Sequence, residues 1–251
     1  MADSERTVFS VMTYNIRCGR GKDDVLDLDR IGQIITQSKA KLVGLQEVDR
    51  YNPLRSQNVH QAEHLAKKTN MRYVYSPAIL TRTSLKGEDK WAGFGNAVLT
   101  SLPIERQDKI VLPKHNTREN RSLAVVDTVI DGKPLTFIST HLGLSEKERL
   151  IHIEIIADYI EKKPNPVVLV GDWNEQPGSP TYNYITQILV DAAIETEKEL
   201  PTFAYHSPDP YQANARIDFI FVSPEIHVHD LRVLNNWASD HLPVIADLSL
   251  A

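Results

Sequence analysis

The sequence predicts a single α/β domain over residues 1–251, in which two mixed β-sheets pack face to face and helices cover their outer surfaces. The length of 251 residues exceeds the usual domain size, but it is routine for one α/β or double-sheet domain. Short apolar runs of strand length alternate with segments of helical periodicity. A strand-helix-strand unit also occurs twice along the chain, which favours two similar halves.

The repeated unit joins two apolar strands through a helix. The first copy reads VFSVMTYNI, DRIGQIITQS and LVGLQEVD, and the second reads LTFISTHL, EKERLIHIEIIADYIEK and VVLVGDWNE. In each copy a polar residue ends the first strand, Asn15 or His141, and an acidic residue ends the second, Glu47 or Asp172. We therefore expect two sheets whose strand ends meet in one cleft.

The remaining elements follow from hydrophobic periodicity and capping residues. Strands are expected at 8–14, 42–45, 97–100, 123–129, 135–139, 167–170, 217–222 and 244–248. Helices are expected at 29–38, 59–69, 146–161 and about 180–189. Long loops rich in Pro, Gly, Asn and aromatic residues are expected at 49–58, 81–96, 114–121 and 202–215. Long loops on a compact domain commonly carry binding residues.

Composition excludes several classes of protein. Hydrophobic residues make up 41% and charged residues 24%, so the chain is neither largely disordered nor fibrous. No apolar run approaches the ~20 residues of a membrane span, and the start MADSERTVF lacks the apolar segment of a signal peptide. We expect a soluble monomer, cytoplasmic or, if a leader was removed, secreted. One cysteine excludes an internal disulfide and a thiolate zinc cluster.

The net charge bears on the kind of partner. A formal charge of −5 disfavours a broad basic face for long nucleic acids, because such binding neutralises many phosphates. Arginines in loop-like stretches, among them Arg55 and Arg121, suit bidentate recognition of a single phosphate. A solvated surface position is the alternative for each of them.

Two polar side chains follow the apolar run VVLV. Asp172 and Asn174 are two residues apart, and residues at that spacing project to the same side of a strand, so both should face one point. Glu47 likewise follows the buried run LVGL, where a carboxylate costs several kcal/mol unless a group such as a cation compensates it. An exposed loop acid beside Asp49 and Arg50 is the alternative for Glu47.

Asp218 lies within the apolar strand RIDFIFV and needs a partner there. A histidine that the carboxylate can orient and charge is the natural candidate, and we assign His241 to that position. An ion pair with Arg216 is the alternative. In ASDHLPV, Pro243 prevents normal strand pairing, so Asp240 and His241 should lie on a bend at the strand mouth. A turn-capping role is the alternative for Asp240.

His141 and Asn15 are weaker candidates when taken singly, since each could be a structural residue at a strand end. As a set, the candidate residues supply carboxylates, amides and two imidazoles. An oxygen-rich pocket with few carboxylates suits Mg²⁺, with Mn²⁺ as a possible substitute, and fits zinc less well. Imidazoles beside a hard cation can stabilise charge that grows on phosphate oxygens, which favours phosphoryl chemistry.

Seven motifs together resemble the endonuclease/exonuclease/phosphatase superfamily, which includes pancreatic-type deoxyribonuclease, abasic-site endonucleases, neutral sphingomyelinases and inositol polyphosphate phosphatases. In chain order they read TYNIR, LQEVD, GFGNAVLTS, STHL, VGDWNE, RIDFIFV and SDHLPV. The resemblance implies a four-layer α/β sandwich of the deoxyribonuclease type, with the site at one end of the two sheets. The segment EVDRYNPLRSQNVHQAEHLAKKT is more similar to the compact bacterial members than to abasic-site endonucleases.

The resemblance also implies a role for each candidate residue. Asn15 and Glu47 resemble metal ligands, with Asp240 near the same ion. Asp172 resembles the residue that aligns or deprotonates water, and Asn174 a ligand of the phosphate. Asp218 resembles the partner of a charged His241, and His141 the second phosphate-facing histidine. On the substrate side we place three further residues: Arg55, Asn96 and Arg121.

The predicted function is hydrolysis of a small-molecule or lipid-headgroup phosphodiester by a Mg²⁺-dependent phosphoesterase. Water activated by Asp172 would attack phosphorus in line, without a covalent intermediate. A nuclease of the same fold is the first alternative, and a non-catalytic module that binds a phosphorylated ligand is the second. The chain contains neither a G-x-S-x-G elbow nor a P-loop, which disfavours a serine hydrolase and a nucleotide-driven motor.

Overall fold

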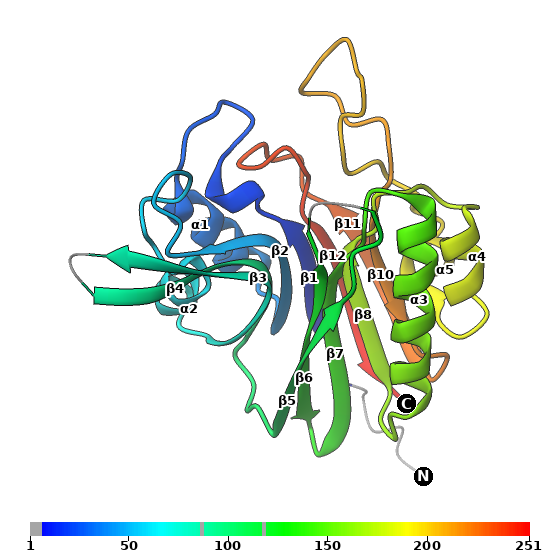
Figure 1. Ribbon diagram of the computed structural model, residues 1–251. Coiled ribbons are helices and arrows are strands. Elements are labelled where there is room, and N and C mark those ends of the chain that lie inside the picture. Colours follow the sequence, from blue (N-terminus) through cyan, green and yellow to red (C-terminus); the bar gives the residue numbers. More distant parts are fainter. Residues whose placement is uncertain (1–6, 86–87, 117–118) are drawn as a thin grey trace.

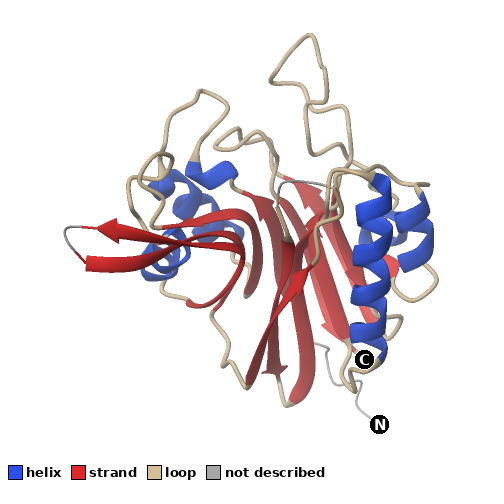
Figure 2. Ribbon diagram, viewed as in Figure 1, coloured by secondary structure: helices blue, strands red, loops and turns tan. Residues whose placement is uncertain are grey.

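The computed structural model describes residues 7–85, 88–116 and 119–251 of the chain. Two six-stranded sheets pack face to face, and helices cover the outer face of each sheet (Figures 1 and 2). Both sheets are mixed, and the layers follow the order helix, sheet, sheet, helix. The predicted four-layer α/β sandwich is therefore confirmed.

The first sheet has the strand order β11-β12-β1-β2-β4-β3. Its strands are β1 Phe9–Asn15, β2 Leu42–Arg50, β3 Arg72–Leu85, β4 Glu88–Thr100, β11 Ile226–Val233 and β12 Val244–Leu250. β1 and β2 are parallel, and the other neighbours are antiparallel. The parallel pair is the first half of the predicted repeat, connected through the helix α1.

The second sheet has the strand order β5-β6-β7-β8-β10-β9. Its strands are β5 Arg106–Leu112, β6 Arg121–Ile130, β7 Lys133–His141, β8 Val167–Asp172, β9 Val190–Asp191 and β10 Asp218–Val222. β7 and β8 are parallel, and the helix α3 connects them. This second parallel pair is the other half of the repeat.

The helices are α1 Leu28–Ser38, α2 Gln61–Thr69, α3 Glu146–Glu161, α4 Pro180–Ile185 and α5 Ala192–Glu195, with a 3₁₀ turn η1 at Arg17–Gly19. The residues just before α1 and α3 cap these helices. The Asp27 side chain accepts hydrogen bonds from backbone N–H groups of α1, and the Ser145 side chain accepts one from α3. α2 begins two residues later than predicted because His60 caps it. Among the described residues, no helix is both long and apolar enough to cross a membrane.

Three apolar layers hold the sandwich together. Side chains alternate between the two faces of each strand, so neighbours such as Val11 and Met12 enter different layers. The layer between the sheets includes Val11, Val98, Phe137, Val170, Ile220 and Ala246. The layer under α1 and α2 includes Met12, Ile31, Ile35, Leu45 and Leu65. The layer under α3 and α4 includes Ile138, Ile153, Ile156, Leu169 and Phe219.

The structure corrects several predicted boundaries. Four strands were not predicted, namely β3, β5, β9 and β11. β5 is largely exposed and β9 has only two residues, whereas the apolar alternation of β3 and β11 is interrupted by register shifts. The predicted loop 81–96 is mostly the β3–β4 hairpin, apart from residues 86–87, which lie outside the described residues. The predicted loop 114–121 likewise includes 117–118, outside the described residues. The helix predicted to reach 189 ends at Ile185, where Thr186 caps it.

Candidate active site

The carboxyl ends of the two parallel strand pairs meet at one end of the sandwich. Asn15 pairs with Gln46 in the first sheet, and His141 pairs with Asp172 in the second. The Asn15 amide donates to Oδ2 of Asp172 over 2.9 Å and so joins the two sheets. Deeper in the interface, the Gln46 amide donates to the Ser139 hydroxyl over 3.0 Å. The predicted convergence of strand ends is confirmed.

A glycine allows β8 to approach β7 just before the site. A Cβ on Gly171 would lie 2.2 Å from the carbonyl oxygen of Thr140, a distance that real Cβ atoms do not show. Glycine is thus required at the position that precedes Asp172.

Asp172 is the centre of the contacts in the site. It is 1% exposed, and its Oδ1 accepts from the backbone N–H of Asn174 over 2.9 Å. Its Oδ2 lies 3.3 Å from Nε2 of His141 and 3.6 Å from Nε2 of His241. Burial raises the pKa of Asp172 above its ordinary value, although the charge of His241 opposes the shift. A buried carboxylate with a raised pKa is a stronger base than an exposed one.

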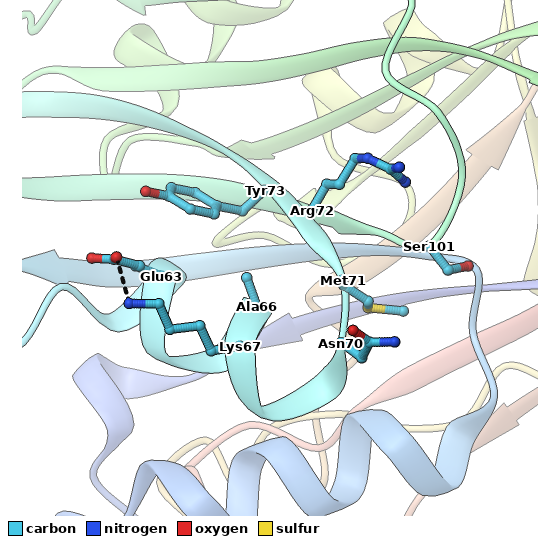
Figure 3. Close-up of a pocket in the computed structure, with 8 residues that line it drawn as sticks. All are labelled: Glu63, Ala66, Lys67, Asn70, Met71, Arg72, Tyr73 and Ser101. Carbon is cyan, nitrogen blue, oxygen red and sulfur yellow. Dashed lines mark hydrogen bonds and ion pairs between the residues drawn. The ribbon is translucent and has the colours of Figure 1, made fainter.

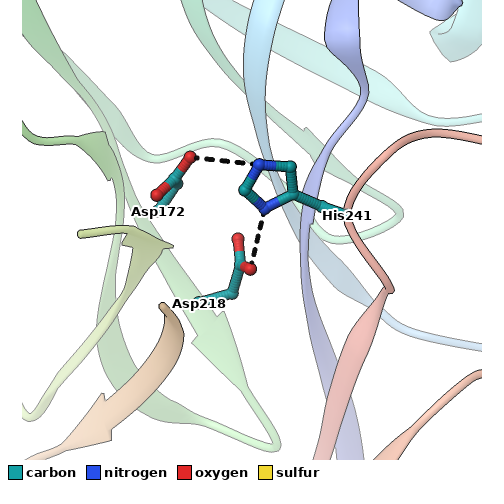
Figure 4. Close-up of side chains that lie close together, drawn as sticks. All are labelled: Asp172, Asp218 and His241. Carbon is teal, nitrogen blue, oxygen red and sulfur yellow. Dashed lines mark hydrogen bonds and ion pairs between the residues drawn. The ribbon is translucent and has the colours of Figure 1, made fainter. Parts of the chain in front are cut away.

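Asp218 orients the ring of His241 through its Nδ1. Its Nδ1 lies 2.9 Å from Oδ2 of Asp218, while its Nε2 faces Asp172 (Figure 4). Burial alone would lower the pKa of His241, but the two carboxylates outweigh it and raise that pKa above its ordinary value. The predicted partner of Asp218 is confirmed, because Arg216 instead binds Asp191 over 2.8 Å.

Two residues that the sequence did not indicate complete this dyad. The hydroxyl of Thr202 donates to Oδ2 of Asp218 over 2.6 Å, and the ring of Phe203 lies 4.6 Å from that of His241, centroid to centroid. Both residues lie at the start of the 202–215 loop, whose sequence shows no hydrophobic periodicity. The sequence therefore gives no local sign that they contact the dyad. Their positions show that the start of the 202–215 loop supports the dyad.

Three residues of the dyad region could hold a metal ion. Single ligand atoms of Asp172, Asp218 and His241 lie within 4.8 Å of one another among the described residues. Both ring nitrogens of His241 already face a carboxylate, however, so a metal ion there would compete with the hydrogen bond to Asp218 and the ion pair with Asp172. The neighbouring carboxylate of Glu47 is not engaged by a cationic side chain among the described residues.

Glu47 projects into the site because β2 contains a bulge. Leu45 pairs with Ala97 and Val48 with Gly95, so Gln46 and Glu47 together face a single residue of β4. Glu47 has a φ of 55°, in the left-handed region that residues with side chains seldom occupy. Such backbone strain is concentrated at functional positions.

The carboxylate of Glu47 lacks an ion-pair partner among the described residues. Its Oε1 accepts from the Asn15 amide over 3.2 Å. Burial raises the pKa of Glu47, and the nearby Asp240 raises it further, while His241 and Arg121 lower it. Asp240 itself lies 3.5 Å from Nε of Arg17. Asn15 and Glu47 are therefore in contact, with Asp240 close enough to act on Glu47, and a bound cation would compensate the Glu47 carboxylate.

His141 and Asn174 also lie beside Asp172. The Asn174 amide donates to the carbonyl of Leu142 over 3.0 Å and lies 2.9 Å from Nε2 of His141. Burial, followed by the charge of Arg121, lowers the pKa of His141 well below its ordinary value, so the ring is neutral. A neutral Nε2 can either accept from the amide or donate to Asp172, but it cannot do both.

The three predicted substrate-binding residues have different positions. Arg121 is buried, binds Glu119 over 2.6 Å, and acts electrostatically on both Glu47 and His141. Asn96 instead donates to the backbone carbonyl of Ser122 over 2.5 Å and links the two sheets. Arg55 forms a bidentate pair with the buried Asp49, at 2.9 and 2.6 Å. Of the three, Arg121 has the most direct electrostatic influence on the cluster.

An ion pair that the sequence did not indicate clamps the two strand ends. Nε of Arg149 on α3 donates to Oε2 of Glu175 over 2.7 Å, and its Nη1 donates to the carbonyls of Gly143 and Leu144 over 3.3 and 2.8 Å. Glu175 directly follows Asn174. Because one side chain binds the segments after both β7 and β8, it fixes their relative position.

A wide hollow of about 760 Å³ lies far from this cluster (Figure 3). It is bordered by the end of α2 and the start of β3, where Arg72 pairs with Thr100 at the amino end of β2. Its lining includes the ion pair between Glu63 and Lys67. None of the candidate site residues lines it, so it does not belong to the site.

Similar proteins of known sequence cover almost the whole chain. The profile of the Endonuclease/Exonuclease/phosphatase family matches residues 12–241. The chain is also 24% identical to the uncharacterized protein YbhP of Escherichia coli strain K12 over 253 residues, a match that covers 96% of each chain.

Solved structures with the same fold cover nearly all of the chain. An endonuclease/exonuclease/phosphatase protein from Beutenbergia cavernae is 26% identical with a TM-score of 0.80, over 98% of this chain and 72% of that one. A mannosyl-6-phosphatase from Bacteroides thetaiotaomicron is 20% identical with a TM-score of 0.79, over 96% and 100%. TDP2 of D. rerio, complexed with a single-strand DNA product, is 16% identical with a TM-score of 0.69, over 97% and 99%. With these matches and the family profile, the chain belongs to the endonuclease/exonuclease/phosphatase family.

Proposed function

We propose that this protein is a Mg²⁺-dependent phosphoesterase that hydrolyses a phosphodiester of small-molecule or lipid-headgroup type by in-line attack of water. The observation that carries the proposal is the position of Asp172. One buried carboxylate contacts an amide of the first sheet, a neutral imidazole and a charged imidazole. A base and groups that stabilise negative charge are thereby gathered around one point.

The residues near Glu47 fit a hard divalent ion. Glu47, Asn15 and Asp240 would hold it, since all three offer oxygen atoms and Glu47 has no ion-pair partner among the described residues. When bound, Mg²⁺ would polarise a phosphate oxygen and neutralise charge on the leaving alkoxide.

Asp172 acts on the attacking water. Its raised pKa brings its basicity closer to neutral pH, where proton transfer from water is most effective. The Asn174 backbone and the Asn15 side chain both donate to the carboxylate and keep it in one orientation. Water bound to this carboxylate would therefore be aligned with the phosphorus atom.

His241 and its partners act on the phosphate. Asp218 keeps the imidazole charged, so it can stabilise the negative charge that develops on the phosphate oxygens. Asn174 and the neutral His141 supply uncharged polar atoms beside the same carboxylate. Arg121 adds a second positive charge near the same point.

Relatives with this fold support phosphate-ester chemistry without deciding the substrate. One is named a mannosyl-6-phosphatase, and another, TDP2, holds a single-strand DNA product. The formal charge of −5 makes a long nucleic acid the less favoured substrate here. Nuclease activity is thus an outcome for the test rather than the proposal.

The test measures hydrolysis of four substrates in parallel: bis-p-nitrophenyl phosphate, p-nitrophenyl phosphate, sphingomyelin and plasmid DNA. Each is offered with Mg²⁺, with Mn²⁺ and with EDTA. We expect diester hydrolysis that EDTA abolishes and that Asp172→Ala and His241→Ala remove. Turnover that both substitutions leave unchanged would disprove the assignment, and cleavage of DNA alone would favour the nuclease.

A further inference from the structure

Two histidines lie next to each other on an edge strand of the first sheet. This strand, β11, reads IHVHDLRV over Ile226–Val233 (Figure 1). His227 and His229 are exposed, whereas Val228 between them packs in the layer between the sheets. Because side chains two residues apart on a strand project to the same side, the two imidazoles share the solvent-facing side of this edge.

The two rings are close enough to bind one ion together. Their centroids are 4.4 Å apart and their planes are inclined at 86°. Two imidazoles that bind one ion through bonds of about 2.0–2.1 Å have ring centroids on the order of 4.5–5 Å apart. The observed separation is thus near that of two ligands of the same ion. Both rings are exposed, so packing in the core does not account for their pairing.

A buried hydroxyl supports one of the two rings. Nε2 of His229 lies 2.9 Å from Oγ of Ser249, a fully buried residue of β12 that is also the cross-strand partner of His227. A metal-binding histidine commonly donates its second ring N–H to a neighbouring polar oxygen, which fixes the ring and its tautomer. When Nε2 of His229 donates to Ser249, Nδ1 carries no hydrogen and can bind a cation.

The carboxylates on this edge are already engaged. Asp230 pairs with Lys198, and Asp247 pairs with Arg232 over 2.6 Å. The two imidazoles are therefore the protein ligands on offer, and water would complete the coordination. Sites that combine nitrogen and water ligands suit Cu²⁺ and Ni²⁺, and the affinity of divalent ions for such ligands is greatest for Cu²⁺. Mg²⁺ prefers oxygen ligands and competes poorly here.

The histidine pair lies at the end of the sheet opposite to the candidate active site. His227 pairs with Ser249 near the end of β12, whereas His241 precedes the start of that strand at Val244. The strand from Val244 to Ser249 spans on the order of 15–20 Å. An ion bound by the pair would thus be separate from the one near Glu47.

We propose that His227 and His229 form a surface site that chelates a divalent transition-metal ion and binds Cu²⁺ most tightly. Ser249 is a positioning residue, because it holds the ring of His229 without touching the ion. The inference goes beyond the proposed function, since it assigns a second metal site with a different class of ligand, and it does not depend on phosphoesterase activity.

Two measurements on the purified protein test the site. Calorimetric titration with CuCl₂ in the presence of excess Mg²⁺ measures the affinity, and EPR spectroscopy of the Cu²⁺ complex reports the number of nitrogen ligands. His227→Gln and His229→Gln each remove one imidazole at an exposed position, and Ser249→Ala removes the supporting hydroxyl. The matched control is His64→Gln, which removes a part-exposed imidazole of α2 that pairs with Asp29.

We expect each histidine variant to bind Cu²⁺ more weakly by on the order of tenfold or more, because the second ligand of a chelate binds within the same molecule. Ser249→Ala should weaken binding by on the order of tenfold. The wild-type protein and His64→Gln should show two nitrogen ligands, and each histidine variant one. Affinity that either histidine variant retains, or a wild-type spectrum with fewer than two nitrogen ligands, would overturn the site.

Discussion

The side chain of Asn15 donates to Oδ2 of Asp172 over 2.9 Å, although 157 residues separate them and they belong to different sheets. The same amide lies 3.2 Å from Oε1 of Glu47. One short side chain therefore connects the proposed base to the proposed metal ligand. Because this contact depends on how the sheets pack, the geometry of the site is sensitive to the whole sandwich.

Replacing the proposed base should abolish most turnover. We expect Asp172→Asn to lower kcat by about 10²–10⁴-fold, because an amide cannot take a proton from water. KM and folding should change little, since the two side chains have the same shape. Steady-state hydrolysis of bis-p-nitrophenyl phosphate measures both constants. Asp230→Asn, at a carboxylate on β11 that pairs with Lys198, is the matched control. A fully active Asp172→Asn enzyme would refute the role.

The pH dependence of kcat/KM should report on the protonation of Asp172 and of His241. Activity falls at low pH as Asp172 is protonated, and because its pKa is raised, this limb lies above the range of an ordinary aspartate. Activity falls again at high pH as His241 loses its proton, and its raised pKa places that limb above the range of an ordinary histidine. In Asp218→Asn the pKa of His241 should drop, so the alkaline limb should move to lower pH. An alkaline limb that stays in place would show that another group causes it.

Binding of the metal should stabilise the protein through Glu47. Any ligand that binds only the folded state raises the melting temperature. We expect added Mg²⁺ to raise the Tm of the wild-type protein and to have little effect on Glu47→Gln, which loses the charge at the bulge. Glu225→Gln, at an exposed position before β11, should respond as the wild type does. Thermal denaturation at several Mg²⁺ concentrations tests this, and an equal rise in Glu47→Gln would place the ion elsewhere.

Breaking the Arg149–Glu175 clamp should affect both stability and activity. Arg149→Gln leaves the buried Glu175 without its partner, which costs on the order of 3–5 kcal/mol. Turnover should also fall, because Asn174 follows in the same segment and the loop after His141 loses two hydrogen bonds.

A double variant separates these two effects. Arg149→Met with Glu175→Leu removes both charges, so the free energy of unfolding should recover in urea denaturation. If the clamp positions the site, kcat of the double variant should stay low while KM stays near that of the wild type. Recovery of kcat together with stability would show that the clamp is only structural.

Much of the fold could be predicted from local pattern. The apolar patterns of β1, β7 and β8 and the caps of α1 and α3 are properties of short segments, and they led to the two strand-helix-strand halves. β5 is largely exposed, and the apolar alternation of β3 and β11 is interrupted where their register shifts, at Pro77–Ile79 and Val228–Asp230. The order of the seven motifs along the chain was enough to indicate the family.

The sequence by itself determined which residues lie at strand ends, since that follows from the period of each strand and from the residue that ends it. Only the tertiary structure decided which of them touch. It selected His241 over Arg216 as the partner of Asp218, placed Glu47 in a bulge, and brought Thr202, Phe203 and Arg149 to the site. The physical reason is range: periodicity and capping act within a few residues, whereas these contacts join distant segments that only the packing of two sheets brings within hydrogen-bond distance.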